Sequence, residues 1–311
     1  MTDLILHHYP QSPFAEKARL LLGFKGLSWH SVMIPPVMPK PDLTALTGGY
    51  RRTPVLQVGA DIYCDTALIA RRLEQEKAAP ALFPEGQEAA AASLAQFADQ
   101  VLFQHAVAIN FQPKGLAERF AGMPEQVIKG FVADRQKLFS GGTASRLDTE
   151  VALGQWPALL SRLETQLERD GDFLLGSQPS IADFAHYHAL WFVASNRAVA
   201  DALEPYPAVR AWMQRVRDIG HGSHTELSAE QAITIARDAT PAALPADAIA
   251  SPTGLTAGQS VTVSAVDYGT DEVAGTLLYE GAEEIIIARE DERAGVVHVH
   301  FPRFGFRIRA A

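Results

Sequence analysis

Hydrophobic and polar positions in residues 1–80 change from short extended runs to helical stripes and back. The first helix is expected to begin after Ser12, because serine is a preferred N-cap and Pro13 suits the first helical position. The predicted order is a strand at Leu4–Tyr9, a helix from Pro13, a strand at Trp29–Ile34, a hairpin over Val55–Cys64 and a helix at Ala67–Gln75. This is a β-α-β unit, a connection, then a β-β-α unit, and it predicts an α/β domain over residues 1–80.

Residues 88–238 carry only the helical period, which predicts an all-α domain. Ser180 and Asp183 form a capping box that opens a very apolar helix, and a helix of that kind belongs at the centre of its domain. The predicted helices are Ala89–Gln112, Glu125–Phe139, Glu150–Arg169, a helix from Ile181 through Val193, Pro207–Val216 and Ala229–Arg237.

After residue 238 the pattern changes twice. Residues 239–258 are rich in Ala, Pro and Thr and are interpreted as a linker. Residues 250–311 then follow a period of two, which predicts a small all-β domain that we interpret as an SH3-like barrel. The plainest role for it is to cover apolar helix surface. Its predicted strands are Ser260–Val266, Val273–Tyr279, Glu284–Arg289, Val296–Phe301 and Phe306–Arg309.

Composition narrows the function classes. Hydrophobic residues make up 47% and charged residues 20% of 311 residues, which is typical of a soluble globular chain of two or three domains. The net charge of −9 lacks the basic footprint of nucleic-acid binding, so no nucleic-acid partner is expected. No apolar stretch is long enough to span a membrane and the N-terminus lacks a signal-peptide pattern, so we expect a cytoplasmic protein without a membrane partner.

Cysteine and histidine do not indicate a metal site. Cys64 is the single cysteine, which excludes an internal disulfide and a cysteine-built zinc site, and a small buried strand residue is its simplest interpretation. The ten histidines include the alternating pair His298 and His300, but none stands at ligand spacing from a carboxylate. We therefore expect packed or solvated histidines and no metal.

Four motifs, in register, resemble glutathione transferases. They are Ser12-Pro13-Phe14-Ala15-Glu16-Lys17-Ala18-Arg19-Leu20, Thr53-Pro54-Val55-Leu56, Asp65-Thr66-x-x-Ile69 and Ser180-Ile181-Ala182-Asp183. The first is similar to the omega-class signature, with serine where that class has cysteine, and its continuation to Leu27 is similar to the zeta class, which uses serine. The resemblance covers residues 1 to about 238 and implies a thioredoxin-like domain followed by the helical domain of this family.

The resemblance also implies a site for glutathione as co-substrate. Ser12 would donate a hydrogen bond to the glutathione sulfur while the helix dipole favours the thiolate. A plain N-cap role is the alternative for Ser12, and the two roles can coexist because a hydroxyl both accepts and donates. Tyr9 is a secondary catalytic candidate, since some classes use a tyrosine near the end of this strand, although His8 stands at the aligned position.

Residues of the other motifs are expected to hold the tripeptide. Asp65 suits its ammonium group, and Thr66 offers a hydroxyl and free N–H groups at a helix start. A cis Pro54 would turn the backbone of Thr53 toward an extended peptide. Arg52 is the cation we assign to the glycyl carboxylate, with Arg51 and Lys40 as alternatives. The glutathione-binding candidates are Phe14, Arg52, Thr53, Pro54, Asp65 and Thr66.

A small electrophile is the expected second substrate, and a homodimer the expected assembly. Phe103, His105 and Phe111 are the candidates to line its site between the two domains, whereas Trp191 is interpreted as core. Because Ser12 and Ala15 occupy the positions of a Cys-x-x-Cys pair, dithiol chemistry is not expected. The alternative function is a transferase-like binding module, without catalysis, whose C-terminal β-domain recruits a partner.

Overall fold

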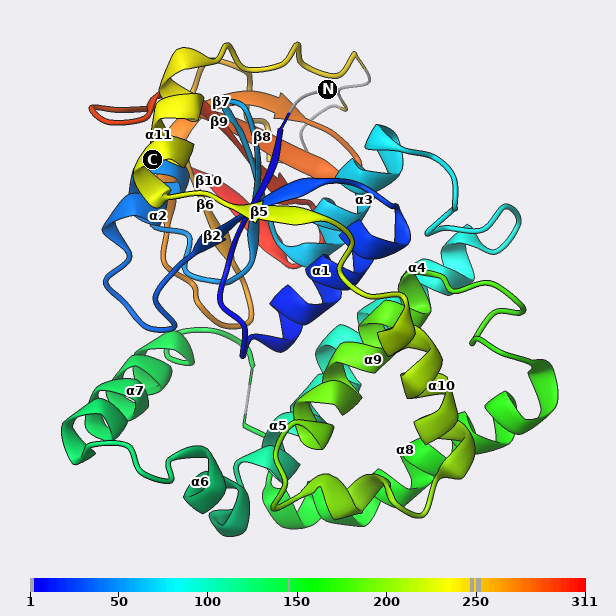
Figure 1. Cartoon of the computed structure of the whole chain (residues 1–311). Coiled ribbons are helices and arrows are strands. Elements are labelled where there is room, and N and C mark those ends of the chain that lie inside the picture. The colour runs from blue at the N-terminus through cyan, green and yellow to red at the C-terminus, as the bar shows by residue number, and fades with distance from the viewer. Residues whose placement is uncertain (1–2, 145, 247–248, 250–252) are drawn as a thin grey trace.

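The computed structural model describes residues 3–144, 146–246, 249 and 253–311 (Figure 1). Parts of the predicted linker, residues 247–248 and 250–252, lie outside the described residues. The chain begins with β1 (Leu4–His8), α1 (Pro13–Phe24), β2 (Trp29–Met33), α2 (Pro41–Thr47), β3 (Val55–Val58), β4 (Asp61–Cys64) and α3 (Thr66–Glu76). β1 pairs in parallel with β2 and antiparallel with β3, which in turn pairs antiparallel with β4. This confirms the predicted thioredoxin-like order, with α2 as an added helix.

The helical block follows. Its elements are α4 (Glu88–Phe97), the π-helical turn η1 (Ala98–Leu102), α5 (Phe103–Asn110), α6 (Pro113–Arg119), α7 (Glu125–Leu138), α8 (Thr149–Asp170), α9 (Ile181–Ala194), the 3-10 turn η2 (Ala200–Leu203) and α10 (Pro207–Asp218). The long helix predicted at residues 89–112 is therefore interrupted by the π-helical turn, and α6 was not predicted. A π-helical turn still satisfies the backbone, so hydrophobic periodicity hardly reveals it.

The capping box of α9 is present as predicted. Asp183 is fully buried, and its carboxylate accepts hydrogen bonds from the Ser180 backbone at 2.9 Å, from the Leu174 backbone at 2.9 Å and from Trp212 Nε1 at 2.9 Å. These bonds join the start of α9 to α10 and to the preceding loop. The apolar α9 consequently runs through the centre of the helical block, where almost all of its residues are buried.

The chain returns to the sheet after α10. A short strand, β5 (His224–Glu226), pairs in parallel with β2, and α11 (Ala229–Asp238) packs against α2, β2 and β9. From its helical period, α11 was predicted to belong to the helical block of residues 88–238. Its buried residues Ile233 and Ala236 instead join the core beside the C-terminal strands, and Figure 1 shows α11 lying over the sheet.

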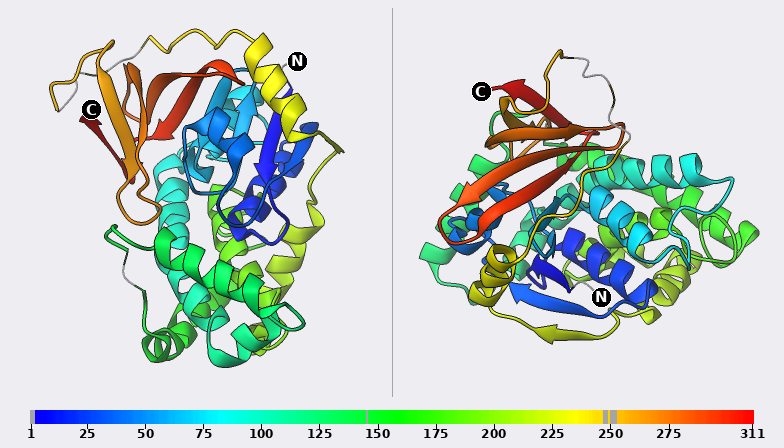
Figure 2. Two further views of the ribbon diagram at one scale, coloured as in Figure 1. Left: turned by 90° about the vertical axis from the view of Figure 1, so that its left-hand side faces the viewer. Right: turned by 90° about the horizontal axis from the view of Figure 1, so that it is seen from above.

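Five C-terminal strands extend the same sheet. They are β6 (Ser260–Ala265), β7 (Val273–Glu280), β8 (Glu284–Asp291), β9 (Gly295–Pro302) and β10 (Phe306–Ala310), close to the predicted ranges. β9 pairs in parallel with β4 through Asp61–Tyr63, so the described strands form one sheet in the order β10-β6-β7-β8-β9-β4-β3-β1-β2-β5 (Figure 2). The strand-rich region is thus joined edge to edge with the N-terminal sheet.

Two large apolar cores, and a small one formed by Ile5, Val32 and Ala232, lie against this sheet. Along β4 the side chains alternate, as expected for a strand: Tyr63 packs with the core shared by α1, α3 and the helical block, whereas Ile62 and Cys64 pack with the core shared by α2, α11 and the C-terminal strands. Both sides of β4 are therefore buried. The site residues at the ends of β1, β3 and β4 are held by packing from both directions.

Candidate functional site

Ser12 caps α1 immediately after the end of β1. Its Oγ accepts a hydrogen bond from the Ala15 backbone at 3.2 Å, and its own backbone N–H donates to the Tyr9 carbonyl at 3.2 Å. The residue is only 3% exposed. Its oxygen therefore already accepts from the helix, which leaves the hydroxyl proton to serve as a donor at the positive end of the helix dipole.

Thr53 and Pro54 lie beside Lys40 at the start of β3. The Thr53–Pro54 peptide bond is cis. Lys40 is 5% exposed, its Nζ donates to Thr53 Oγ1 at 3.0 Å, and it lies 5.9 Å from the centre of the Tyr9 ring. Burial, together with repulsion from Arg135, lowers the pKa of Lys40 to about 8. The contacts of Tyr9 and Lys40 thus connect the end of β1 with the Thr53–Pro54 turn.

Asp65 and Thr66 form the start of α3. Asp65 is the N-cap residue, with a positive φ of 74°, and its Oδ1 accepts from the Ala67 backbone at 3.0 Å. Thr66 is buried, at 3% exposure, whereas about a quarter of the Asp65 side chain is accessible. The carboxylate of Asp65 therefore remains available to a cation on the outer side of the helix start.

Arg52 extends toward the C-terminal strands. Its Nε donates to the carbonyl of Tyr268 at 3.2 Å and its Nη2 to the same oxygen at 2.6 Å, while Nη2 also pairs with the Asp267 carboxylate. The guanidinium lies 4.0 Å from the centre of the Tyr268 ring and 3.7 Å, through Nη1, from Asp65 Oδ2. Burial acts to lower the pKa of Arg52, but its neighbours Tyr268, Tyr50, Asp65 and Asp267 raise it above the ordinary value.

The loop between β6 and β7 is a part of this region that the sequence analysis missed. Backbone hydrogen bonds tie it to the chain after α7: Gly269 N–H donates to Leu138 O at 2.6 Å, Thr143 N–H to Val266 O at 3.0 Å and Ala144 N–H to Asp267 O at 3.0 Å. Burial raises the pKa of Tyr268 to about 12. No local sequence signal relates this loop to Arg52, because more than two hundred residues separate them.

Aromatic side chains form a row away from Ser12. Phe14 lies 4.7 Å from Phe103, Phe103 lies 5.9 Å from Phe192, and Phe192 lies 6.1 Å from Phe111, all between ring centres. The predicted residues Phe14, Phe103 and Phe111 are partly exposed, whereas Phe192 is buried. The structure thus brings α1, α5 and α9 together along one aromatic surface.

His105 lies apart from this row. Its Nδ1 is 2.8 Å from the Val101 carbonyl and its Nε2 is 2.8 Å from Gln155 Oε1, so both ring nitrogens are hydrogen-bonded within the helical block.

Beneath Phe14, the fully buried Lys17 pairs with Asp99 of the π-helical turn at 2.7 Å. This buried pair, also missed from the sequence, ties α1 to η1.

Cys64 is fully buried and burial raises the pKa of its thiol, in agreement with a packing residue. In the described part of the chain no group of His, Cys, Asp and Glu side chains is arranged to hold a metal ion. The same residues contain no helix that is long and apolar enough to cross a membrane.

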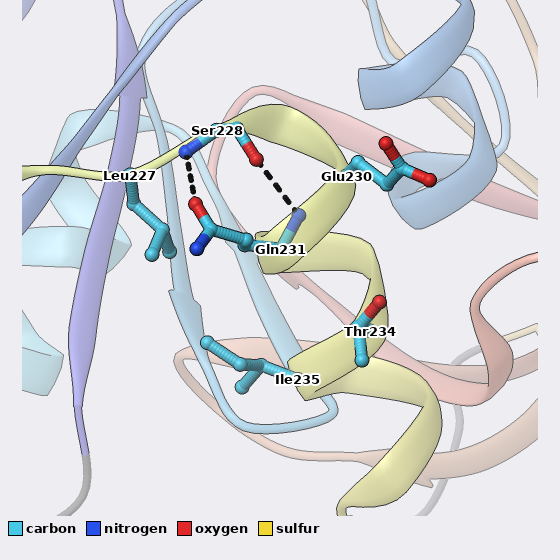
Figure 3. Close-up of a pocket in the computed structure, with 6 residues that line it drawn as sticks. All are labelled: Leu227, Ser228, Glu230, Gln231, Thr234 and Ile235. Carbon is cyan, nitrogen blue, oxygen red and sulfur yellow. Dashed lines mark hydrogen bonds between the residues drawn. The ribbon is translucent and has the colours of Figure 1, made fainter.

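A pocket on α11 is shown in Figure 3. None of the residues that line it is a predicted site residue; they are Leu227, Ser228, Glu230, Gln231, Thr234 and Ile235.

The architecture first defines the class of protein. The chain has a thioredoxin-like unit followed by a helical block that is built around a capped central helix. This is the fold of two-domain thioredoxin-like proteins. Residues 6–81 match the family model for the N-terminal domain of glutathione S-transferase, and residues 116–215 match the model for its C-terminal domain. The chain is also 53% identical to a GST-like protein from Pseudomonas syringae, covering 100% of both chains with a TM-score of 0.85. It belongs to the glutathione S-transferase family.

More distant structures share the fold alone. A glutathione S-transferase from Rhodospirillum rubrum F11 is 18% identical, with a TM-score of 0.52, over 69% of this chain and 87% of that chain. Glutathione S-transferase III in its apo form is 20% identical, with a TM-score of 0.51, over 69% and 91% of the two chains. No curated protein sequence matches the chain.

Proposed function

We propose that the protein is a serine-type glutathione transferase that activates the glutathione thiol for attack on a small electrophile. The observation that carries the proposal is Ser12, whose oxygen is bonded to the start of α1 and whose proton is free to donate to a sulfur. A free thiol has a pKa near 8.5, so stabilising the thiolate by about 2 units raises its fraction strongly at neutral pH. The thiolate forms the new C–S bond, the leaving group departs with its bonding electrons, and the thiol proton passes to solvent.

The other glutathione-binding assignments follow from the contacts. Asp65 would pair with the ammonium group, and Thr66 and Thr53 would bind the peptide backbone beside Pro54. Arg52 is our predicted partner for the glycyl carboxylate, but its donors already serve Asp267 and Tyr268. Lys40, which has no carboxylate partner within the described chain and lies beside Thr53, is the better-placed cation for that role.

The test compares Ser12→Ala with Ser228→Ala. Both serines cap a helix by accepting a backbone hydrogen bond, at 3.2 Å and 3.1 Å, so each change removes about 1 kcal/mol of cap stability. We expect Ser12→Ala to lower kcat/KM at pH 7 by more than about tenfold while changing glutathione affinity by less than about threefold. Ser228→Ala should leave turnover unchanged. Equal turnover in the Ser12→Ala variant and the natural protein would overturn the role of Ser12, and Tyr9 would become the leading candidate.

A specific observation favours the alternative, a glutathione-binding or non-catalytic module. The β6–β7 loop already occupies the donors of Arg52 and approaches Asp65 through it. Calorimetry with glutathione separates them. Micromolar to millimolar binding with a lowered thiol pKa supports the transferase, the same binding without a lowered thiol pKa supports a glutathione-binding module, and no binding at millimolar glutathione supports a non-catalytic module with another partner.

We also propose the family's homodimer and, for the C-terminal region, an SH3-like barrel. Strands β6 to β9 pair in chain order as a meander, and β10 pairs with β6. This arrangement supports the barrel.

A further inference from the structure

Arg119, the last residue of α6, has an unusual environment. Within the described chain it makes neither a hydrogen bond nor an ion pair, and its Nε is buried without a partner. Its guanidinium lies 5.3 Å from the centre of the Phe111 ring and 4.9 Å from the centre of the Phe192 ring. A guanidinium has five N–H donors, and buried donors without acceptors are costly, so this side chain is poised for an acceptor supplied by a ligand.

The position of Arg119 relates it to the proposed active site. Phe111 and Phe192 form the far end of the aromatic row that begins at Phe14, two residues after Ser12. A substrate whose reactive carbon meets a sulfur at Ser12 and whose body packs along this row would extend toward Arg119. The row thus joins the proposed thiolate to an unpaired cation.

The charged groups near Arg119 do not neutralise it. Burial lowers its pKa, the nearby Tyr9 raises it, and Arg135 on α7 lowers it further. Of the two acids on this helix, Glu125 pairs with Lys129 at 2.6 Å, and Asp134 is bound to Arg51 at 2.7 Å and lies 3.6 Å from Arg135.

Lys40 adds another positive charge next to Tyr9, also without a carboxylate partner in the described residues. Asp134 attracts Lys40 electrostatically, but no described carboxylate forms an ion pair with either Lys40 or Arg119.

We propose that the second substrate carries an anionic group, a carboxylate or a similar oxyanion, and that Arg119 binds it at the end of the aromatic row. This inference rests on the proposed function, because it names the class of electrophile for that site. A planar carboxylate accepts two parallel hydrogen bonds from a guanidinium, and the Phe111 and Phe192 rings beside the guanidinium add apolar contact for the body of the substrate. Since Lys40 is assigned to glutathione, the two cations would divide the two ligands between them.

The test uses two alkylating reagents of nearly equal size that are long enough to lie along the aromatic row: a biphenyl with a bromomethyl group at one para end and a carboxylate at the other, and its carboxamide analogue. Each reacts with the glutathione thiolate to form a C–S bond with loss of bromide, and the two differ by one negative charge. The measured quantity is the ratio of kcat/KM for the carboxylate reagent to kcat/KM for the carboxamide reagent, after subtraction of the uncatalysed rates. We expect Arg119→Gln to lower this ratio about tenfold or more, as for loss of a charge-assisted hydrogen bond, and Arg119→Lys to retain part of it. Arg210→Gln, an exposed site on α10, is the matched charge control and should leave the ratio unchanged.

A binding measurement separates this inference from the proposed function. The two products, the biphenyl carboxylate and the biphenyl carboxamide conjugates of glutathione, are titrated calorimetrically into the natural protein and into Arg119→Gln. A tighter binding of the carboxylate conjugate that is lost in Arg119→Gln supports the inference. It does so even if neither reagent is turned over, an outcome that would refute only catalysis. Turnover of the carboxamide reagent with a rate ratio and a binding preference that Arg119→Gln leaves intact would overturn the inference and leave the proposed function standing. Absence of both turnover and conjugate binding would overturn both.

Discussion

At the scale of single residues, His300 on β9 is a buried imidazole that lies between two carboxylates outside the candidate site. Its Nε2 lies 3.0 Å from Asp61 Oδ1 and its Nδ1 lies 3.2 Å from Glu284 Oε2, while its ring stacks on Tyr63 at 4.2 Å. An imidazole that donates from both nitrogens is protonated. Burial opposes this charge, but the hydrogen bonds to the two carboxylates prevail and raise the pKa of His300.

This arrangement predicts a pH-dependent stability. Because the pKa of His300 is higher in the folded than in the unfolded chain, its contribution is complete below pH 6.5 and is lost as pH rises through the folded pKa. His300→Gln should therefore lower the free energy of unfolding by about 2 kcal/mol at pH 6 and by less at pH 8, measured by urea denaturation.

His298→Gln is the control for that prediction. His298 lies on the same strand and 3.7 Å from Asp61, but burial lowers its pKa, so its replacement should cause no loss that grows at low pH. A loss in His300→Gln that is the same at pH 6 and pH 8 would contradict a protonated His300.

At the scale of elements, the β6–β7 loop lies between two parts of the chain that are distant in sequence. On one side it bonds to Arg52, before β3, and on the other to the connection after α7. Gly142 permits this close approach, because a Cβ at that position would lie 1.6 Å from the Asp267 carbonyl oxygen. The loop is held by these backbone contacts together with the packing of Tyr268 against Arg52 and Phe139.

Gly142→Ala should therefore release the loop. The added methyl cannot coexist with the present approach of Asp267, so the hydrogen bonds from Thr143 and Ala144 to the loop must lengthen. We expect amide hydrogen exchange in residues 266–270 to accelerate by about tenfold or more, as measured by mass spectrometry, because local opening becomes easier.

Gly154→Ala is the matched control, since an added Cβ there, on α8, has no neighbour within 4 Å in the described structure. Unchanged exchange in residues 266–270 of Gly142→Ala would show that the loop is not held by this contact.

At the scale of the whole molecule, one sheet joins the C-terminal strands to the thioredoxin-like unit. The pairing of β9 with β4 places Cys64 in the same core as Ile287 of β8, whereas Leu160 of α8 belongs to the core of the helical block. The strand-rich region and the N-terminal sheet should therefore open together, as one cooperative unit.

The single cysteine reports on this coupling. Ile287→Ala and Leu160→Ala both remove buried methyl groups at fully buried positions, at a cost of about 2–5 kcal/mol. We expect Ile287→Ala to accelerate the modification of Cys64 by a thiol reagent in native buffer at least about tenfold more than Leu160→Ala does. Equal acceleration by the two variants would mean that the whole chain unfolds as a single unit.

Much of the local structure follows from the sequence itself. Periodicity located the C-terminal strands to within two residues at each end, and Ser12 with Pro13 marked the start of α1, because capping and side-chain alternation are set by neighbouring residues. The short strand β5 and the helix α6 were missed because three exposed residues and a helix of seven residues carry almost no periodic signal.

The sequence by itself also determined the family of the fold and the candidates Ser12, Thr53, Pro54, Asp65 and Thr66, because each belongs to a local motif. Only the tertiary structure decided that β9 pairs with β4, that the loop at Tyr268 binds Arg52 and that Arg119 lies against Phe111 and Phe192 without a polar partner. The physical reason is that a hydrophobic pattern specifies which face of a strand or helix is buried. It does not specify which distant strand edge or side chain completes that burial.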